Sequence, residues 1–399
     1  MSQSKTNRIV IIGAGYAGLK ALEALSKNPH NEIFLLDKNP YHFMQTDVYD
    51  LIANEYDFSH VTTDLFTYCA GFKNSVIFKK ELVIGIDFQH KKVETQNQRL
   101  SYDYLIIAVG SSTKFPENIF GLKEYGYGVK ALHRAIYFKQ KFESALFKKI
   151  QEEGSVCQPL HIVIAGGGLS GVEIAAQMAS YAQEFYKENH YICRKLNIDL
   201  INSPSQILQG MDSKLILAAE KKLKALGVNI ITNRKVVEVK EGSVTLSEGE
   251  VLQTDFMIYA GGIEPNALIF DIDVPKNEKG YILTNEHLQV EGFSDVFAIG
   301  DCAVLKGENR VAPTADIAEQ MGAFVAKNIE NSVQKKKLKK HNIKPRGVLI
   351  ALGRGYAAAK IFGFNFNGYI AYIVKKLIEK RYYRHVNHIS KKGCKKIFS

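Results

Sequence analysis

Three glycines near the start of the chain, Gly13, Gly15 and Gly18, have the spacing of a turn that binds the pyrophosphate of a dinucleotide. In such a turn the first glycine permits a tight bend, the second lets the backbone approach the pyrophosphate, and the third lets a helix pack closely on a strand. The free N–H groups at the start of that helix would bind the phosphates. Asp37, 19 residues past Gly18, has a carboxylate that could accept a hydrogen bond from a ribose hydroxyl.

A second glycine turn begins at Gly166, 153 residues after Gly13, and ends at Gly171. One chain with two such turns is expected to bind two dinucleotides. The strand that follows the second turn ends on Asn202 in place of an acid, 31 residues past Gly171. An amide can bond to ribose hydroxyls but lacks the charge that rejects a 2′-phosphate, and no arginine follows within 203–205 to favour one. We therefore expect this turn to bind NADH rather than NADPH.

The elements around both turns have the pattern that the fingerprint requires, namely an apolar strand, a helix and a second apolar strand. In chain order these are 8–12, 19–25 and 32–36 for the first turn, and 161–165, 172–178 and 197–201 for the second. Short β-branched strands that alternate with helices are typical of parallel sheets. The sequence therefore predicts an α/β fold class with two Rossmann-like dinucleotide-binding domains.

Further apolar strands end on small or acidic residues, which is where open α/β sheets bind ligands. These residues are Ala108 and Gly110 in the run 104–110, Gly261 in the run 256–262, and Gly300 with Asp301 in the run 297–301. Small residues at a strand end let the backbone pass close to a ligand. An isolated Gly-Asp pair is weak evidence, but it gains weight beside the first glycine turn.

Positive charge is concentrated at the end of the chain. From Lys335 onward there are 18 Lys and Arg residues and one acidic residue, Glu379, whereas the rest of the chain has 34 basic and 40 acidic residues. The five cysteines have no C-x-x-C spacing, which favours a reducing compartment, and no metal site is expected. The polar first residues do not resemble a signal peptide, and no run reaches the roughly 18 apolar residues of a membrane span, so proton-pumping machinery is not expected.

The segment 368–384 has the pattern of a basic amphipathic helix. The apolar positions are Ile370, Ile373, Val374, Leu377 and Ile378, and the basic positions around the rest of the helix are Lys375, Lys376, Lys380 and Arg384. Such a helix lies in the headgroup plane of an anionic membrane. Docking of the helix on the protein body or in a homodimer is the alternative. Nucleic acid is not an expected partner, because no nucleic-acid-binding motif accompanies the charge.

Together, the two glycine turns and the Gly300–Asp301 strand end resemble the two-dinucleotide-binding-domain flavoprotein family. The resemblance implies that the first turn binds FAD, that Asp301 contacts its ribityl chain and that the backbone of Val83 contacts its adenine. With the basic tail, it implies an FAD domain at 1–113 and 255–330, an inserted NADH domain at 114–254, and a C-terminal membrane-associating region at 331–399. The expected FAD contacts are Gly13, Ala14, Gly15, Gly18, Asp37, Lys38, Val83, Ala108, Gly110, Gly300, Asp301 and Ala315.

Within that family the likeness is to type II NADH:quinone oxidoreductases. It is carried by Y-H-F at 41–43, by Glu173 at the end of G-G-G-L-S-G-V-E, and by 312–320, which is similar to the family pattern P-T-A-Q-x-A-x-Q. In 312–320 Asp316 replaces the first Gln while Gln320 matches, and the resemblance implies that both positions border the quinone. The expected NADH contacts are Gly166, Gly168, Leu169, Ser170, Gly171, Glu173, Asn202 and Gly261.

The same resemblance implies a lysine that approaches the flavin and Glu173, and the segment 374–378 offers Lys375 and Lys376. We take Glu173 and Lys376 as the expected catalytic pair. The implied enzyme binds FAD, sits on the cytoplasmic face of the cell membrane, and passes electrons from NADH to menaquinone or ubiquinone without pumping protons. A sulfide:quinone oxidoreductase is an alternative, but it needs a cysteine pair at the flavin, and only Cys302 is well placed, since Cys157 precedes its strand. A nucleotide-binding redox sensor at the membrane is a further alternative.

Overall fold

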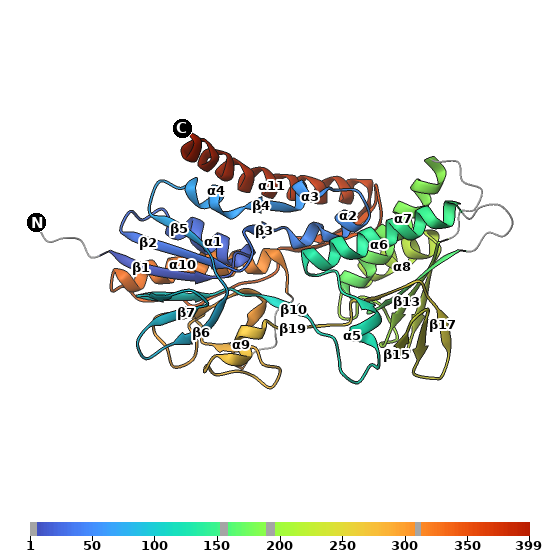
Figure 1. Ribbon diagram of the computed structural model, residues 1–399, viewed down its shortest axis with the longest axis horizontal. Coiled ribbons are helices and arrows are strands. Elements are labelled where there is room, and N and C mark those ends of the chain that lie inside the picture. The colour runs from blue at the N-terminus through green and yellow to red at the C-terminus, as the bar shows by residue number, and fades with distance from the viewer. Residues whose placement is uncertain (1–5, 152–158, 189–195, 308–312) are drawn as a thin grey trace, which may run out of the picture.

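The computed structural model describes residues 6–151, 159–188, 196–307 and 313–399. Its N-terminal part contains a parallel sheet of five strands in the order β21-β9-β1-β2-β5 (Figure 1). The strands are β1 (Asn7–Ile12), β2 (Asn31–Asp37), β5 (Val76–Lys80), β9 (Tyr104–Ile107) and β21 (Val296–Ala298). The apolar residues of β1, β2 and β9 are buried on both faces, as in other parallel sheets.

Helices cover one face of this first sheet and a small antiparallel sheet covers the other. On the helical face α1 (Tyr16–Leu25) packs against α10 (Ala315–Val333), and a Cβ on Gly322 of α10 would meet the Ala17 carbonyl oxygen at 2.3 Å. The opposite face packs on residues of the antiparallel sheet β6-β7-β8. These strands are β6 (Val83–Asp87), β7 (Lys92–Thr95) and β8 (Arg99–Ser101).

The second parallel sheet repeats this arrangement, with the strand order β11-β18-β12-β13-β14. Its strands are β11 (Gly126–Tyr127), β12 (Leu160–Ala165), β13 (Leu196–Asn202), β14 (Val228–Thr232) and β18 (Phe256–Tyr259). One face is covered by α6 (Leu132–Gln151), α7 (Leu169–Glu188) and α8 (Ser213–Ala225), and the other by β15 (Val236–Lys240), β16 (Ser243–Leu246) and β17 (Val251–Gln253). The predicted α/β fold class with two Rossmann-like domains is confirmed.

Two crossing segments join the domains, and they pair with each other. β10 (Ser111–Thr113) runs antiparallel to β19 (Ile263–Pro265). The boundary expected at residue 255 precedes β18, which pairs with β12 inside the second sheet. We therefore propose that the boundary falls later, between β18 and β19, so that the second sheet stays intact.

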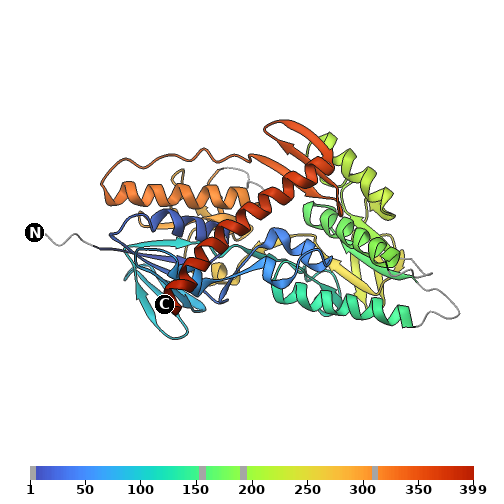
Figure 2. The same cartoon turned by 90° about the horizontal axis from the view of Figure 1, so that it is seen from above.

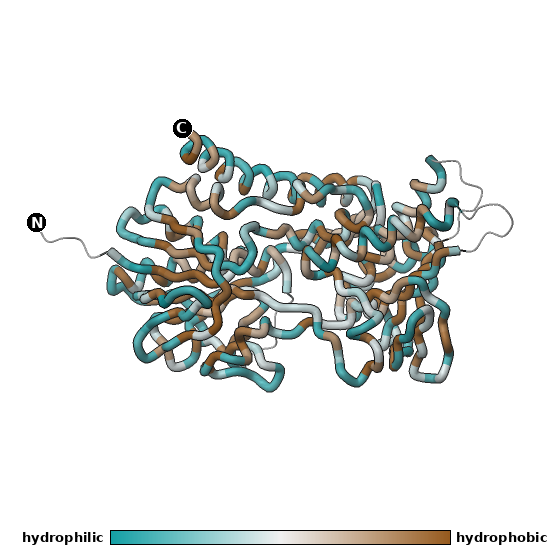
Figure 3. The backbone as a smooth tube through the Cα atoms, viewed as in Figure 1, coloured by the Kyte–Doolittle hydropathy of each residue, from teal (hydrophilic) through white to brown (hydrophobic). Residues whose placement is uncertain are grey.

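The C-terminal region forms a small sheet and one long helix. The sheet has β23 (Gly347–Ala351), β24 (Ala357–Ile361) and β25 (Phe364–Gly368), and it packs on α7 and α8 of the second domain. From there α11 (Tyr369–Phe398) runs across to α4 (Leu65–Ala70) of the first domain (Figures 1 and 2). Teal and brown segments alternate along α11, whereas the strands of both sheets are mostly brown (Figure 3). Within the described ranges, no helix is long and apolar enough to cross a membrane.

Candidate active site

The first glycine turn connects β1 to α1 and leaves one of its glycines open to a ligand. Gly13 has a φ of +104°, and a Cβ there would meet the Ala108 carbonyl oxygen at 2.4 Å. A Cβ on Gly18 would meet the Gly13 carbonyl oxygen at 2.0 Å, so both positions need glycine for packing. Gly15, in contrast, is exposed and has no atom within 4 Å of its Cβ position. It therefore offers backbone N–H groups and free space at a helix N-terminus, which is what a pyrophosphate requires.

The acid at the end of β2 stabilises this turn by hydrogen bonds. The carboxylate of Asp37 accepts hydrogen bonds from the backbone N–H of Ala14 and of Asn39, both at 2.8 Å. Burial raises the pKa of Asp37, while these two bonds oppose the rise. Lys38, the next residue, is exposed. Asp37 and Lys38 thus lie beside the turn, and their contacts with a ribose stay a prediction.

The other expected flavin contacts gather at the carboxyl ends of the first sheet. Gly300 has a φ of +75°, and Asp301 follows it in a short 3-10 helix, η2 (Gly300–Cys302). The carboxylate of Asp301 accepts from the hydroxyl of Ser111 at 2.8 Å and pairs with the ammonium of Lys130 at 3.3 Å. Gly110 lies in open space, and Ala315 begins α10 behind the capping side chain of Thr314. Val83 begins β6 and is buried.

The second glycine turn has the same design as the first. A Cβ on Gly171 would meet the Gly166 carbonyl oxygen at 1.8 Å, while Gly168 is exposed with no atom within 4 Å. Asn202 is buried, and its side chain accepts from the Gly167 N–H at 3.1 Å and donates to two carbonyl oxygens of the loop 204–206. These three bonds show Asn202 holding the turn, and its contact with a ribose stays a prediction. Gly261, just past β18, is exposed.

Two polar side chains at the start of α7, Ser170 and Glu173, form hydrogen bonds with neighbouring segments. Ser170 accepts from the hydroxyl of Tyr49 at 2.7 Å. Leu169 is half-buried, as is Glu173, whose carboxylate accepts from the backbone N–H of Ala351 in β23 at 2.8 Å. Burial raises the pKa of Glu173 to about 7, and the charge of Lys375 opposes the rise. Glu173 therefore sits where a small change of environment would change its protonation near neutral pH.

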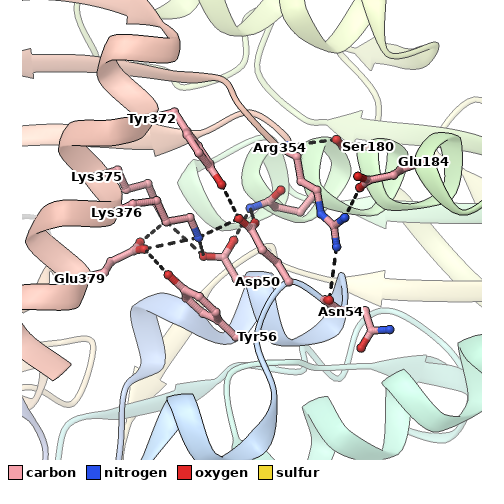
Figure 4. Close-up of polar contacts among 12 residues, drawn as sticks. Asp50, Asn54, Tyr56, Ser180, Glu184, Arg354, Tyr372, Lys375, Lys376 and Glu379 are labelled. Carbon is pink, nitrogen blue, oxygen red and sulfur yellow. Dashed lines mark hydrogen bonds and ion pairs between the residues drawn. The ribbon is translucent and has the colours of Figure 1, made fainter. Parts of the chain in front are cut away.

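Lys375 and Lys376 both turn inward from α11 to meet acids of the first domain (Figure 4). The ammonium of Lys376 lies 2.9 Å from Asp50, 3.0 Å from Glu55 and 4.1 Å from the centre of the Tyr56 ring. Lys375 is buried, pairs with Glu379 and lies 3.5 Å from Asp50. Although its burial disfavours a charge, the neighbouring acids hold the pKa of Lys375 well above its ordinary value. A helix that binds a membrane through its basic residues would expose both lysines, but neither lies on the exposed side of α11.

The expected quinone residues lie on the first turns of α10, and both contact the segment before β23. Asp316 pairs with the guanidinium of Arg346 at 2.7 Å and accepts from the Arg346 N–H at 3.0 Å. The Gln320 amide donates to Asp316 and to the Lys344 carbonyl oxygen, each at 3.0 Å. Asp316 thus forms an ion pair with Arg346, which the uncharged glutamine of the family pattern could not form. Quinone contacts at both positions stay predictions, and Ala312, at the start of the same segment, lies outside the described residues.

A histidine links α11 to the first glycine turn. His42, in β3 (Tyr41–Phe43), is buried, and its Nδ1 lies 2.7 Å from the Ala14 carbonyl oxygen. Because a carbonyl only accepts, Nδ1 carries the hydrogen and Nε2 accepts from the hydroxyl of Tyr382 in α11, at 3.0 Å. Burial lowers the pKa of His42 to about 4, so the ring is neutral. The Y-H-F likeness thus has a structural basis in this contact between strand, turn and helix.

Sequence reasoning missed Asp50, which pairs with both lysines, and Asp47, a buried acid three residues before it. Asp47 and Asp50 are buried, and they lie in η1 (Gln45–Asp47) and α2 (Val48–Ile52). No motif marks them, and hydrogen-bonded partners such as Asp50 and Lys376 stand 326 residues apart in the chain. One signal was available, because Glu379, the single acid of the basic tail, follows Lys375 by one helical turn.

Comparison with known proteins agrees with this arrangement. Residues 7–322 match the family model described as pyridine nucleotide-disulphide oxidoreductase. A demethylphylloquinone reductase NdbB from Synechocystis sp. is 30% identical over 386 residues, covering 93% of this chain and 91% of that protein. A type II NADH:quinone oxidoreductase from Staphylococcus saprophyticus subsp. saprophyticus is 26% identical over 390 residues, covering 96% of each.

Solved structures show the same fold at lower identity. The structure of NDH2 from Plasmodium falciparum in complex with NADH gives a TM-score of 0.84 at 20% identity, covering 97% of this chain and 98% of that one. The sulfide:quinone oxidoreductase from Aquifex aeolicus gives a TM-score of 0.80 at 18% identity, covering 96% and 92%. The glycine turns, the sheet order and the family match lead to one conclusion: the chain belongs to the pyridine nucleotide-disulphide oxidoreductase family.

Proposed function

We propose that this protein is a type II NADH:quinone oxidoreductase, which binds FAD on the first glycine turn and NADH on the second and passes two electrons to a quinone. The observation that carries the proposal is the pair of turns, each with one exposed glycine, Gly15 or Gly168, that opens onto free space at a helix N-terminus. Curated relatives of nearly the same length, named as reductases of quinones, support the choice of acceptor.

FAD, when bound, supplies the chemistry that accepts a hydride from NADH and returns electrons to a quinone. The residues at the first site fit that cofactor, with an open Gly15, an acid at the end of β2 and Asp301 at a strand end. Glu173 and Lys375 provide an acid and a cation at the start of α7 and in α11. We propose Lys375, in place of Lys376, as the partner of Glu173, because Lys375 is the more buried of the two lysines and its charge opposes the rise in the pKa of Glu173.

The sulfide:quinone oxidoreductase alternative is not supported, because the cysteine that it would use is buried. Cys302 is fully buried, and its thiol donates to the Ile299 carbonyl oxygen at 3.2 Å. Burial raises the pKa of Cys302 to about 12, whereas carrying sulfur requires an accessible thiolate. Cys157, the other candidate, lies outside the described residues. The second glycine turn, intact here, supports a nicotinamide donor.

We also propose that α11 attaches the protein peripherally to an anionic membrane, on the cytoplasmic face. The apolar side chains of Ile370, Leu377 and Ile378 are 72%, 60% and 52% exposed, so the predicted apolar face is not covered by the protein body. Basic side chains of the same helix are exposed too, among them Lys380 and Arg384. A homodimer that buries this face is the competing arrangement.

Steady-state oxidation of NADH by the purified FAD-loaded enzyme, with a water-soluble quinone as acceptor, tests the enzymatic proposal. We expect kcat/KM to be higher for NADH than for NADPH, because Arg234, whose backbone N–H donates to the Asn202 carbonyl oxygen, has its guanidinium paired with Glu248 at 2.7 Å instead of being free for a 2′-phosphate. Quinone reduction driven by sulfide with no oxidation of NADH would refute the proposal. Tight binding of both nucleotides with negligible quinone turnover would instead indicate the redox sensor.

A further inference from the structure

Quinone reduction by NADH takes up one proton from solvent. The reaction NADH + H⁺ + quinone → NAD⁺ + quinol needs two hydrogens on the quinone, and the hydride of NADH supplies both electrons and one of them. The second hydrogen is a solvent proton, which must reach the reacting site through the protein. If the proposed function holds, the reacting site must receive this proton, and hydrogen-bonded side chains are one path by which it can arrive.

A short hydrogen-bonded chain leads from a buried acid to the first glycine turn. The Thr46 hydroxyl donates to Oδ1 of Asp47 at 2.8 Å, and the Tyr16 hydroxyl lies 2.8 Å from Thr46 Oγ1. Tyr16 directly follows the open Gly15, and Asp47 is only 4% exposed. A hydroxyl can rotate and has one hydrogen, so when Asp47 carries the proton the Thr46 hydrogen can turn from Asp47 to Tyr16, and Asp47 can then donate to Thr46. Burial raises the pKa of Tyr16, which keeps a proton on its oxygen between transfers.

The other end of this hydrogen-bonded chain, Asp47, interacts electrostatically with Glu379, Lys375 and Asp50 of the charged cluster of α11 and α2, which Figure 4 shows. This cluster and its surroundings hold more carboxyl groups than ammonium groups among the described residues. The acids are Asp47, Asp50, Glu55, Glu173 and Glu379, and the bases are Lys375 and Lys376. A buried site does not hold several uncompensated negative charges, so some of these carboxyl groups carry a proton near neutral pH.

Asp47 is the acid that the geometry singles out for the proton. Burial and the charges of Glu379 and Asp50 raise the pKa of Asp47 to about 7, against the opposing charge of Lys375. Tyr16 of α1 connects to it through Thr46, and the phenol of Tyr382 in α11 interacts with its charge. Asp50, by contrast, touches both lysines, which lower its pKa.

The cluster also contains a hydrogen-bond acceptor without a partner among the described residues, and two tyrosines lie between the cluster and the surface. Gln177 is buried, its amide nitrogen contacts Asp50, and its Oε1 has no hydrogen-bond partner among the described residues. This oxygen could accept a hydrogen bond from a proton donor or a water molecule. Two half-buried tyrosines line the edge, with Tyr372 donating to Glu55 at 2.6 Å and Tyr56 donating to Glu379 at 3.3 Å.

We propose that Asp47 relays the solvent proton of quinone reduction to the reacting site through Thr46 and Tyr16, and that the Lys375–Glu379–Asp50 cluster returns a proton to it. In one cycle the Asp47 O–H bond breaks as Thr46 takes the proton, Thr46 passes its own to Tyr16, and Tyr16 passes its own toward the quinone oxygen. A solvent proton entering past Tyr56 and Tyr372 then restores Asp47. No electron moves in the relay.

The test separates the two half-reactions of the FAD-loaded enzyme by stopped-flow spectroscopy, using Asp47→Asn and Tyr16→Phe. We expect both variants to be reduced by NADH at the wild-type rate, and their reoxidation by a water-soluble ubiquinone to be about 10- to 100-fold slower. Reoxidation by ferricyanide, which takes electrons and no protons, should be unchanged. The wild-type rate with quinone should fall as the pH rises through about 7 and should show a solvent deuterium isotope effect, and Asp47→Asn should lose both.

Matched controls keep the result interpretable. Tyr68→Phe removes another buried tyrosine hydroxyl, one that donates to Glu23 outside the relay, and Asp57→Asn changes an exposed helix-capping aspartate; both should reoxidise normally with quinone. Asp47→Glu retains a carboxyl and should recover part of the rate. Wild-type reoxidation by quinone in Asp47→Asn and Tyr16→Phe would overturn the relay, as would equal losses with quinone and ferricyanide. A wild-type enzyme that fails to oxidise NADH would instead refute the proposed function.

Discussion

Buried carboxyl groups only a few residues apart have pKa values shifted in opposite directions because of where the lysines lie. Asp50 meets the ammonium groups of Lys375 and Lys376 and stays ionised, although its burial alone would raise its pKa. Asp47, three residues earlier, receives a hydrogen bond from Thr46 and no ion pair among the described residues, so burial raises its pKa. Burial by itself therefore does not decide protonation, and the position of each ammonium group does.

Replacing Asp47 with Asn should stabilise the protein at pH 8 more than at pH 5. The folded-state pKa of Asp47, about 7, lies above that of an unfolded aspartate, so its stabilising contribution is full at low pH and is lost between about pH 4 and pH 7. The neutral amide of Asn does not lose this contribution. We expect the free energy of unfolding of the variant, relative to wild type, to rise by about 1–3 kcal/mol from pH 5 to pH 8 in urea titrations. A difference that is the same at both pH values would contradict this charge state.

Replacing Lys375 with Met should destabilise the protein far more than the same change at Lys380. Lys375 is buried between Asp50 and Glu379, so its removal leaves two buried carboxylates without this partner. Breaking a buried ion pair in this way costs about 3–5 kcal/mol. Lys380, five residues later on the same helix, is exposed and should change the free energy of unfolding by less than about 0.5 kcal/mol. Similar losses in both variants would mean that Lys375 is not held as the structure shows.

At the scale of elements, α11 shows what sequence periodicity can and cannot predict. The repeat of apolar residues predicted a helix from 368, and α11 begins at Tyr369, although it continues to Phe398, past the expected end at 384. The repeat did not indicate which side of the helix packs on the protein body. Ala371 and Lys375 are buried while Leu377 is 60% exposed, because acids of α2 and α11 neutralise the lysine and make its burial acceptable.

The dinucleotide-binding parts were predictable because their signals are local. A glycine spacing, an apolar run and a terminal acid lie within one βαβ unit, and β1, α1 and β2 formed at the expected places. The acid–lysine cluster was not predictable, because it joins Asp50 to lysines more than 300 residues later and depends on how α11 crosses the two domains. Lys130 escaped notice for the same reason, since it reaches Asp301 across 171 residues.

Replacing Gly393 with Ala should loosen the end of α11 from α4. A Cβ at Gly393 would meet the Thr67 carbonyl oxygen at 1.8 Å, and a Cβ at Gly71 would meet the Ile389 carbonyl oxygen at 2.2 Å, so the two backbones touch. Alanine normally favours a helix by about 1 kcal/mol over glycine. Here we expect a net loss of about 1–3 kcal/mol from overpacking.

Hydrogen exchange is the measurement that locates this loss. Amides of α4 and of the last turns of α11 should exchange faster in Gly393→Ala, with those of α7 unchanged. Lys392→Ala, at the exposed neighbouring position, should leave exchange unaltered or slow it. Unchanged protection of α4 in Gly393→Ala would mean that the close helix contact does not form in solution.

At the scale of the whole molecule, α11 connects the two nucleotide domains and separates the charged cluster from the outside. Its inner side packs on α4 and meets Asp50 of α2 through Lys375 and Lys376 (Figures 1 and 2). Its outer side carries exposed apolar and basic residues. The hairpin of β24 and β25, just before α11, adds Phe362 in its turn and Phe364 at the start of β25, each 77% exposed.

Replacing Ile370, Leu377 and Ile378 together with Ser should detach the protein from anionic vesicles while leaving NADH oxidation with ferricyanide intact. Burying such side chains stabilises a bound state by about 1.5–3 kcal/mol each when burial is complete. Even partial burial of the three should therefore weaken binding by at least about 100-fold in vesicle sedimentation. Wild-type binding should also fall steeply with salt, because each basic residue near an anionic surface contributes about 1 kcal/mol and is screened within a Debye length.

The matched control for this variant is Phe270→Ser. Phe270 is 55% exposed, but it lies in α9 (Ala267–Asp271), on the side of the molecule away from α11 (Figure 1). Its loss should leave vesicle binding unchanged, since α9 does not face the proposed membrane. Equal binding by the triple variant and the wild type would refute attachment through α11. If the triple variant instead turned a dimer into a monomer in light scattering, with wild-type binding to vesicles, the exposed apolar face would be a subunit interface and the membrane contact would lie elsewhere.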